Sequence, residues 1–260
     1  IGANGGVGVT KAAAADLTGG NTVAVEANLT IATSAGTTAA FGYNALDDAK
    51  AIAAAINLNA SSIGVTAKAT NSATLSGIVS AGTIGMTLNG TAISTNVADP
   101  SDLTALVSAI NGVQGTTGVT ASFTSSSSKT GITLSTSDGR DISILDFAHS
   151  GATKTVSFSG VTLTGGAATD SSIKSGSVTL DSSKGAITLG GANADAFTTA
   201  TQTSTFSSVA SLSISSSANA QLAIATIDAA LAQVNVSRGD LGAYQNRFAS
   251  AIANLQTTAE

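Results

Sequence analysis

The side chains that usually carry catalysis are scarce in this chain of 260 residues. It has no cysteine and a single histidine, His149, in the polar stretch DFAHSGA. One histidine cannot build an HExxH zinc site, which places two histidines on one helix face. A serine nucleophile would need His149 as its general base, and we expect a lone histidine in a polar loop to be an exposed surface residue. The sequence therefore predicts a protein that is not an enzyme.

Two acidic pairs and one glycine-rich run are the remaining candidates for a ligand site. Asp47 and Asp48 fit a helix start, and Asp138 and Asp141 flank a turn. Calcium takes about six to eight oxygen ligands, more than either pair offers. The run ITLGGAN is not followed by the Lys-Ser or Lys-Thr of a phosphate-binding loop. We therefore predict no metal site and no cofactor.

Serine- and threonine-rich loops permit another kind of chemistry. The run TSSSSKTG, residues 124–131, is typical of a flexible hairpin tip. Exposed hydroxyls of this kind can accept O-linked glycans or bind external glycans, and composition permits both. Sugar sites usually stack aromatic rings, however, and only 3% of the residues are aromatic. The low aromatic content counts against a carbohydrate site.

The tripeptide Arg238-Gly239-Asp240 spells the adhesion signal that integrins bind. Arg238 lies between Val234 and Leu241 at helical spacing, so we expect it on the apolar face of a helix. Asp240 would then lie about 200° further around that helix, at about 100° per residue. An integrin ligand needs both charges presented together from an exposed loop. We therefore interpret the tripeptide as part of a helix-packing segment.

Composition describes a protein with few charges and small core side chains. Hydrophobic residues make up 43% of the chain and charged residues 10%, and the formal net charge is −5. Non-specific binding to nucleic acid or to anionic membrane needs a positive surface, so we expect neither partner. No apolar run is long enough to span a bilayer, so we expect no membrane insertion. The low charge and abundant Ser, Thr, Gly and Asn suit an extracellular, sheet-rich surface protein.

Apolar and polar residues alternate through residues 20 to about 200, which predicts antiparallel strands. Asn89-Gly90 separates two alternating runs, and this dipeptide is a strong short-range hairpin signal. In the segment 21–33 the alternating residues are Val23, Val25, Leu29 and Ile31. We expect hairpins over 83–95, 154–166 and 176–191.

Two stretches of this region repeat each other. IAAAINLNASSIGVTA begins at Ile52, LVSAINGVQGTTGVTA begins at Leu106, and the two align without a gap. Each places Ala-Ile-Asn near the end of a short apolar-periodic segment and then runs into Gly-Val-Thr-Ala. Short polar oxygens at Asp47-Asp48 and at Ser101-Asp102 fit helix starts. We expect each copy to form a short helix followed by a β-hairpin, with Asp138-Gly139 as a turn in the second copy.

The pattern changes from about residue 206, where apolar residues recur at steps of three, four and seven. This spacing predicts one stripe along a helix of about 40 residues. The members of the stripe are Ile224, Ile227, Leu231, Val234, Leu241, Tyr244, Phe248, Ile252 and Leu255. No other segment of the chain predicts a helix of similar length, so we expect the stripe to pack on another polypeptide or on a part of the parent protein outside this sequence.

The stretch that carries this stripe, residues 215–260, resembles the C-terminal helix of bacterial flagellin. The resemblance rests on IDAALAQVN, on Arg-x-Asp-Leu-Gly-Ala, and on Gln-Asn-Arg-Phe and Ile-Ala-Asn-Leu. The two Ala-Ile-Asn repeats resemble the short IN motif of many flagellins. The opening IGANGG and the run GSVTLDSSKGAITLGGAN resemble segments that bound the variable part of the family.

Patterns and resemblance together predict an α+β protein, with an antiparallel β-rich outer part that contains short helices and a long amphipathic C-terminal α-helix. We expect residues 1–20 to start the variable region and 21–150 to form outer α+β modules with a two-copy helix-hairpin repeat. Residues 151–205 would form β-hairpins that lead back to the inner domain, and 206–260 its long helix. Flagellins also carry long N-terminal helices and a further C-terminal helix. We see neither in these residues, so we expect a central fragment.

The resemblance implies a structural subunit of the flagellar filament, secreted to the bacterial flagellum. Its partners would be other flagellin subunits, a flagellar export chaperone, a cap protein and an innate-immune receptor that contacts Gln245, Asn246 and Arg247. The residues expected to pack between subunits are Ile227, Leu231, Val234, Leu241, Tyr244, Phe248, Ile252 and Leu255. The alternative is a flagellin-like cell-surface protein whose outer domain binds carbohydrate or mediates adhesion.

Overall fold

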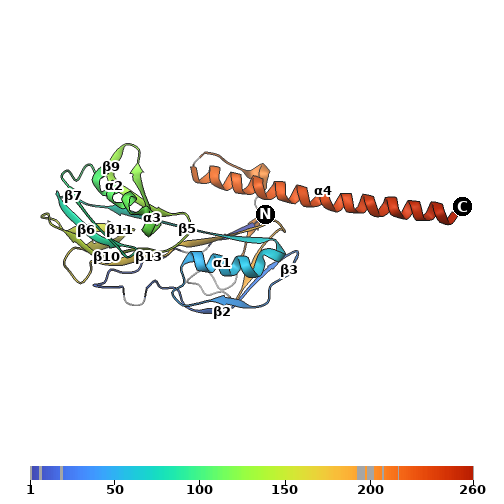
Figure 1. Cartoon of the computed structure of the whole chain (residues 1–260), viewed down its shortest axis with the longest axis horizontal. Helices are drawn as coiled ribbons and strands as arrows, with labels where there is room; N and C mark the ends of the chain where they lie inside the picture. Colours follow the sequence, from blue (N-terminus) through green and yellow to red (C-terminus); the bar gives the residue numbers. More distant parts are fainter. Residues whose placement is uncertain are drawn as a thin grey trace.

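Two β-rich lobes and one long helix make up the part of the chain that the structure, a computed structural model, describes: residues 2–5, 8–17, 20–191, 197, 202–206, 208–215 and 217–259. The helix projects away from both lobes (Figure 1). We call the lobe beside the helix the near lobe and the other the far lobe. Each lobe has its own hydrophobic core. Every ladder between the described strands is antiparallel, as predicted.

The near lobe packs one helix, α1 (Ala49–Ala60), against strands of two sheets. Ile52, Ala53 and Ile56 are buried because their spacing places them on one face of α1. The small side chain of Ala53 lets the helix backbone approach the strands closely. The strands are β1 (Gly2–Gly5), β2 (Glu26–Thr33), β3 (Gly36–Thr37), β4 (Phe41–Tyr43), β14 (Ser177–Ser182), β15 (Thr188–Gly190), β16 (Gln202–Thr203) and β17 (Thr205–Phe206).

The far lobe packs α2 (Thr104–Gly112) and the short α3 (Gln114–Thr117) against its own strands. One sheet has the order β13-β10-β6-β7. Leu106 and Ile110 of α2 are buried in the far-lobe core beside Phe147 and Phe158. The strands are β6 (Gly82–Leu88), β7 (Thr91–Val97), β8 (Thr120–Ser125), β9 (Ser128–Thr136), β10 (Ile142–His149), β11 (Thr155–Phe158), β12 (Val161–Thr164) and β13 (Ser172–Lys174).

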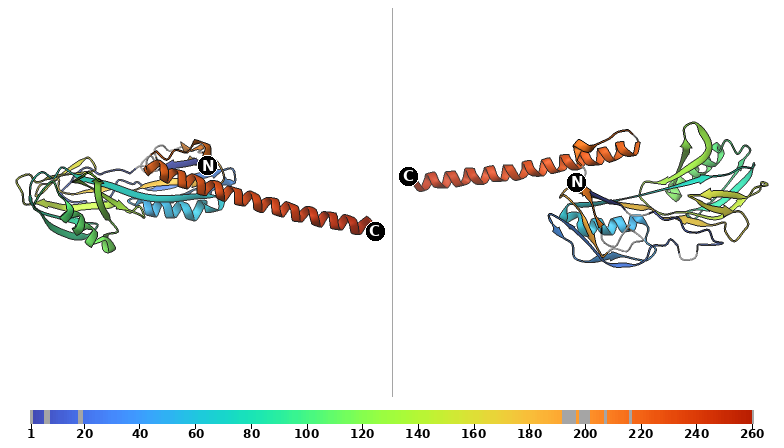
Figure 2. Two further views of the ribbon diagram at one scale, coloured as in Figure 1. Left: turned by 90° about the horizontal axis from the view of Figure 1, so that it is seen from above. Right: turned by 180° about the vertical axis from the view of Figure 1, so that it is seen from behind.

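One long strand, β5 (Val65–Ser76), belongs to both lobes. Its first half pairs with β14 and buries Val65 and Ala67 in the near-lobe core. Its second half pairs with β9 and buries Ala73 and Leu75 in the far-lobe core. The two cores are therefore connected through a continuous backbone ladder, visible as the strand that runs between the lobes in Figures 1 and 2.

Two of the three expected hairpins are confirmed, those over 83–95 and 154–166, and each turns on two residues. β6 and β7 pair around Asn89-Gly90, and β11 and β12 pair around Ser159-Gly160. The hairpin expected over 176–191 is wrong, because β14 pairs with β5 and β1 whereas β15 pairs with β2 and β16. The turn at Asp138-Gly139 joins β9 and β10, which lie in different sheets.

The alternation expected across 21–33 is broken at its start. Val25 is 63% exposed, and the strand begins only at Glu26. The register of β2 against β4 shifts between Glu26 and Leu29, where the Glu26 carboxylate accepts hydrogen bonds from the next two backbone N–H groups. This bulge places Leu29 and Ile31 in the core and leaves Val25 outside it.

The two repeat copies differ after their helices. Asp48 caps α1 as predicted, by accepting a hydrogen bond from Ala51 N at 2.8 Å. α2 begins later than expected, at Thr104, and the Asp102 carboxylate accepts from Thr104 N. The short 3₁₀ helix η1 (Ser61–Ile63) follows α1, and the single strand β5 follows η1, so the hairpin expected in this copy is wrong. In the second copy the β8–β9 hairpin follows the helices.

The predicted long helix is α4 (Ser217–Ala259), which has 43 residues. A 3₁₀ turn, η2 (Val209–Ser211), precedes it, so the helix begins after residue 206, where we placed the change of pattern. α4 continues through Gly239 and Gly242 without interruption. At about 1.5 Å per residue, a helix of this length reaches well beyond the lobes (Figure 2).

We predict that Gly139→Ala destabilises the protein more than Gly160→Ala. Both glycines have a positive φ, 76° and 87°, which costs about 1–2 kcal/mol for a residue with a Cβ. A Cβ on Gly139 would also lie 2.7 Å from the Ala69 carbonyl carbon of β5, whereas a Cβ on Gly160 would meet open space. Urea unfolding of both variants measures the difference, and equal losses would contradict the close approach at Gly139.

Candidate functional site

The apolar stripe of α4 is exposed along its length. The side chains that we expect to pack between subunits range from 42% exposed at Ile227 to 69% exposed at Phe248 and Leu255. The other members, Leu231, Val234, Leu241, Tyr244 and Ile252, fall between these values. A continuous apolar surface of this length is unusual on a protein that works alone. The stripe is therefore the main candidate site of the molecule.

A different side of α4 faces the near lobe. Gln233, Val236 and Asp240 line a shallow depression together with Lys184 and Gly185, which follow β14. Beyond this short region the helix leaves the lobe and continues into solvent (Figure 2). The near lobe therefore approaches a side of α4 that is largely separate from the stripe.

The Arg-Gly-Asp tripeptide lies inside α4. Arg238 lines a surface depression with Val234 and Leu241 of the stripe. Asp240 lines the other depression, the one shared with the near lobe. The two charges therefore face different surroundings, and this arrangement differs from the exposed loop that an adhesion signal requires.

Gln245, Asn246 and Arg247 are all exposed on α4. Because they are consecutive, they spread over about 200° of the helix at about 100° per residue. They therefore do not form one narrow face. Their role as a receptor contact stays a prediction.

In each copy of the Ala-Ile-Asn repeat, the asparagine side chain forms two hydrogen bonds with the backbone of a strand residue. Asn57 Nδ2 donates to Ala67 O at 2.9 Å, and Asn57 Oδ1 accepts from Ala67 N at 2.7 Å. Asn111 makes the same pair of hydrogen bonds with Ala121, at 2.9 and 2.8 Å. The preceding isoleucines, Ile56 and Ile110, are fully buried. We call this arrangement the asparagine clamp: the isoleucine anchors the helix and the amide pairs with the strand as a neighbouring strand would.

The role of these asparagines was not among the features predicted from the sequence. The signal that could have revealed it is the equal separation of asparagine and alanine, ten residues in both copies. An amide at the end of a helix, followed by a strand at a fixed distance, can satisfy one residue's backbone N–H and C=O together.

Comparison with known proteins finds that the regions of the second clamp and of the stripe are both similar to one family. Residues 85–140, which contain the second clamp, match the family model described as the flagellin hook IN motif. Residues 224–260, which contain the stripe, match the model of the bacterial flagellin C-terminal helical region. In these two regions the chain is therefore similar to flagellins.

Curated relatives agree with this assignment. B-type flagellin of Pseudomonas aeruginosa is 54% identical over 54 residues, which cover 21% of this chain and 11% of the relative. The flagellar filament 30.7 kDa core protein of Treponema maltophilum is 53% identical over 51 residues, 20% of this chain and 18% of the relative. Flagellin E of Vibrio cholerae is 47% identical over 55 residues, 21% of this chain and 15% of the relative. The chain thus spans less than a fifth of the length of each of these relatives.

His149 is not the exposed loop residue that we expected. It is the last residue of β10, where it pairs with Ile84 of β6, and only 4% of it is exposed. Its Nδ1 accepts a hydrogen bond from Gly151 N at 2.9 Å. The prediction failed because β10 extends through a stretch whose polar letters suggested a loop. The imidazole has a structural contact at the end of the strand.

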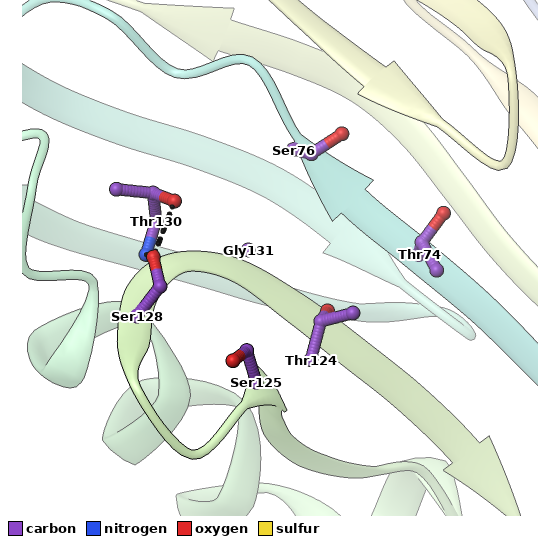
Figure 3. A pocket seen from close by; sticks show the side chains of 7 residues that line it. All are labelled: Thr74, Ser76, Thr124, Ser125, Ser128, Thr130 and Gly131. Carbon is purple, nitrogen blue, oxygen red and sulfur yellow. Dashed lines mark hydrogen bonds between the residues drawn. The ribbon is translucent and has the colours of Figure 1, made fainter.

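The expected hairpin tip at residues 124–131 is confirmed and borders a shallow depression of the far lobe (Figure 3). Its lining side chains are hydroxyls, from Thr74, Ser76, Thr124, Ser125, Ser128 and Thr130, around Gly131. The Phe123 ring, just before this set, has Lys129 Nζ 5.8 Å from its centroid. The depression therefore lacks the aromatic platform of a typical sugar site and does not favour the carbohydrate alternative.

Acidic side chains of the described residues serve local structure. No three of the His, Asp and Glu side chains in this part of the chain gather to hold a metal ion. Arg140 donates to Asp138 at 2.6 Å and Lys50 donates to it at 2.9 Å. The Arg140 hydrogen bonds, reinforced by Lys50, hold the pKa of Asp138 well below its usual range. Within the same residues, no helix combines the length and apolar character needed to cross a bilayer.

We predict that Asn111→Ala lowers the free energy of unfolding by about 1–3 kcal/mol, because it leaves the backbone N–H and C=O of Ala121 without the clamp. Asn59→Ala is the matched control, since Asn59 donates one exposed hydrogen bond within α1. Thermal unfolding and hydrogen exchange at Ala121 measure the effect. If the two variants unfold alike and Ala121 keeps its protection, the clamp does not stabilise the strand.

Proposed function

We propose that this chain is part of a structural subunit of the bacterial flagellar filament, and that α4 buries its apolar stripe against neighbouring flagellin subunits. The observation that supports the proposal most strongly is the exposed stripe inside a segment of flagellin sequence. The subunit has no catalytic step in this account: its activity is assembly. Motility follows from the filament that the subunits form.

The size of the stripe makes it suitable for assembly. Burying one Leu, Ile or Phe side chain contributes about 1.5–3 kcal/mol. Large apolar residues recur along α4 from Ile224 to Leu255. Their combined burial is large enough to offset the loss of translational and rotational freedom on association, which costs about 4–15 kcal/mol.

The lobes fit the role of an outer region. Residues 21–150, with 151–205 leading back, would form the exterior of the filament, and 206–260 would contribute the inner helix. The near lobe faces a side of α4 largely separate from the stripe, so both lobes can lie outside a contact made through the stripe. In this arrangement the subunit is extracellular, on the bacterial flagellum.

Other partners follow from family membership alone. An export chaperone, a cap protein and an innate-immune receptor remain predictions for this chain. For the receptor, the relevant residues are Gln245, Asn246 and Arg247, which are exposed on α4. The self-assembly partner has the additional support of the exposed stripe.

We expect the double substitution Leu231→Ser and Phe248→Ser to abolish or strongly reduce filament assembly. Both side chains are more than half exposed, so their loss should leave the melting temperature of the isolated chain nearly unchanged. The variants are introduced into the gene that encodes this chain, in cells that lack other flagellins. Electron microscopy of filaments and swimming in soft agar provide the measurements.

Ala232→Ser with Ala243→Ser is the matched control, because both residues are exposed on the opposite side of α4 and receive the same new side chain. This control should assemble normally. Filaments of normal number and length from the stripe variant would rule out the stripe as the assembly surface.

A further inference from the structure

The two lobes meet at a small polar region that we call the interlobe joint: Asn21 with residues 69–71, 138–141 and 174–176. Backbones approach closely here. A Cβ on Gly176 would lie 2.9 Å from Ala49 Cβ and 3.0 Å from Thr70 O. The joint therefore has little room for added atoms. The polar groups inside it determine how strongly the near lobe is bound to the far lobe.

Asn21 and Asp141 connect the lobes within this joint. Asn21 Nδ2 donates to Asp141 Oδ2 at 2.7 Å, just before β10 of the far lobe. The same amide lies 3.2 Å from Leu46 O and from Asp47 O, just before α1 of the near lobe. Asn89 Nδ2 also donates to Asp141 O, at 2.9 Å. Asp141 is therefore tied to both lobes.

Two oxygens in the joint are buried without a hydrogen-bond partner, Asp141 Oδ1 and Asn71 Oδ1. Asn71 otherwise holds the joint closed, since its Nδ2 donates to Arg140 O and Lys174 O at 3.0 and 2.7 Å. A buried, unpaired carboxylate oxygen is costly, and protonation of the carboxyl group removes the charge from this site.

The charged groups around Asp141 do not neutralise it. On the α1 side, Asp47 accepts from Asn44 N, and the nearby carboxylate of Asp48 repels Asp141. The cations are engaged elsewhere: Lys50 and Arg140 donate to Asp138, and Lys174 Nζ donates to Gly8 O at 2.7 Å. Burial raises the pKa of Asp141 to about 6. The hydrogen bond from Asn21 is the next largest effect and opposes this rise, the charge of Asp48 adds to it, and the Gly176 N–H opposes it.

We propose that the interlobe joint is a proton-responsive hinge, in which uptake of one proton by Asp141 tightens the contact between the near and far lobes. At neutral pH the joint holds a half-buried negative charge that has hydrogen-bond donors but no cation partner among the described residues, and the lobes are coupled weakly. In mild acid the neutral Asp141 removes the repulsion from Asp48, and the lobes are coupled firmly. The proposal is independent of assembly through α4.

The direction of the pH effect follows from the raised pKa. A carboxyl group with a higher pKa in the folded than in the unfolded state stabilises the fold on protonation, and this contribution disappears as pH rises through the folded pKa. Asp141 should therefore make the protein more stable as pH falls from about 7 towards 4.

Asp141→Asn mimics the neutral state and tests this directly in the purified chain. We expect the variant to be more resistant to urea than the original protein at about pH 7.5, by tenfold or more in the unfolding equilibrium constant, and similar to it near pH 4.5. Asp146→Asn is the matched control, because Asp146 is an exposed carboxylate in β10. The control should keep the original pH profile. An Asp141→Asn profile parallel to the original one would overturn the proposal.

A second measurement separates hinge coupling from stability alone. The chain has no cysteine, so spin labels can be placed at two introduced cysteines, Leu58→Cys on α1 and Ser108→Cys on α2, both exposed. We expect the distribution of distances between the labels to be narrower at about pH 5 than at about pH 8, and equally narrow at both in Asp141→Asn. Widths that do not change with pH in the original protein would overturn the hinge.

Discussion

One constraint shapes the whole molecule: the described parts of the two lobes leave the apolar stripe of α4 exposed to water. Side chains such as Tyr244 and Phe248 are more than half exposed in the single chain. The hydrophobic effect strongly favours their burial. α4 has 43 residues and meets the near lobe over only a short stretch, so most of its length is available to the partner subunits that we propose. The similarity of this segment to flagellins and the exposure of its stripe are therefore both consistent with the proposed assembly.

The lobes solve a different problem, which is how to build a stable β-rich body with few large side chains. Much of each core consists of Ala, Val, Leu and Ile, with single phenylalanines such as Phe147 and Phe158. Small residues let backbones approach closely. Backbone hydrogen bonds and a few side-chain amides then determine which helix packs beside which strand. The asparagine clamps at Asn57 and Asn111 are examples, because each amide satisfies both backbone groups of a strand residue. The continuous strand β5 then connects the two bodies.

Patterns within a short stretch of sequence were enough to predict the long helix and the hairpin with the Asn-Gly turn. The stripe of α4 follows from helical periodicity, and the β6–β7 hairpin follows from the turn chemistry of Asn89-Gly90. Pairing between distant strands could not be predicted in the same way. β14 pairs with β5, more than a hundred residues earlier, and nothing in the run 176–191 encodes that partner. His149 was misplaced for a similar reason, since its burial depends on pairing with β6. The Asn21–Asp141 contact also joins residues far apart in the sequence.

The central claim, that the stripe is buried between subunits, can be tested by a single fluorescent reporter. The chain has no tryptophan, so Phe248→Trp introduces one at an exposed position of the stripe. The account predicts that its emission shifts to shorter wavelength and becomes protected from a soluble quencher when subunits assemble into filaments. A tryptophan that emits and is quenched in filaments as it is in free subunits would contradict the account.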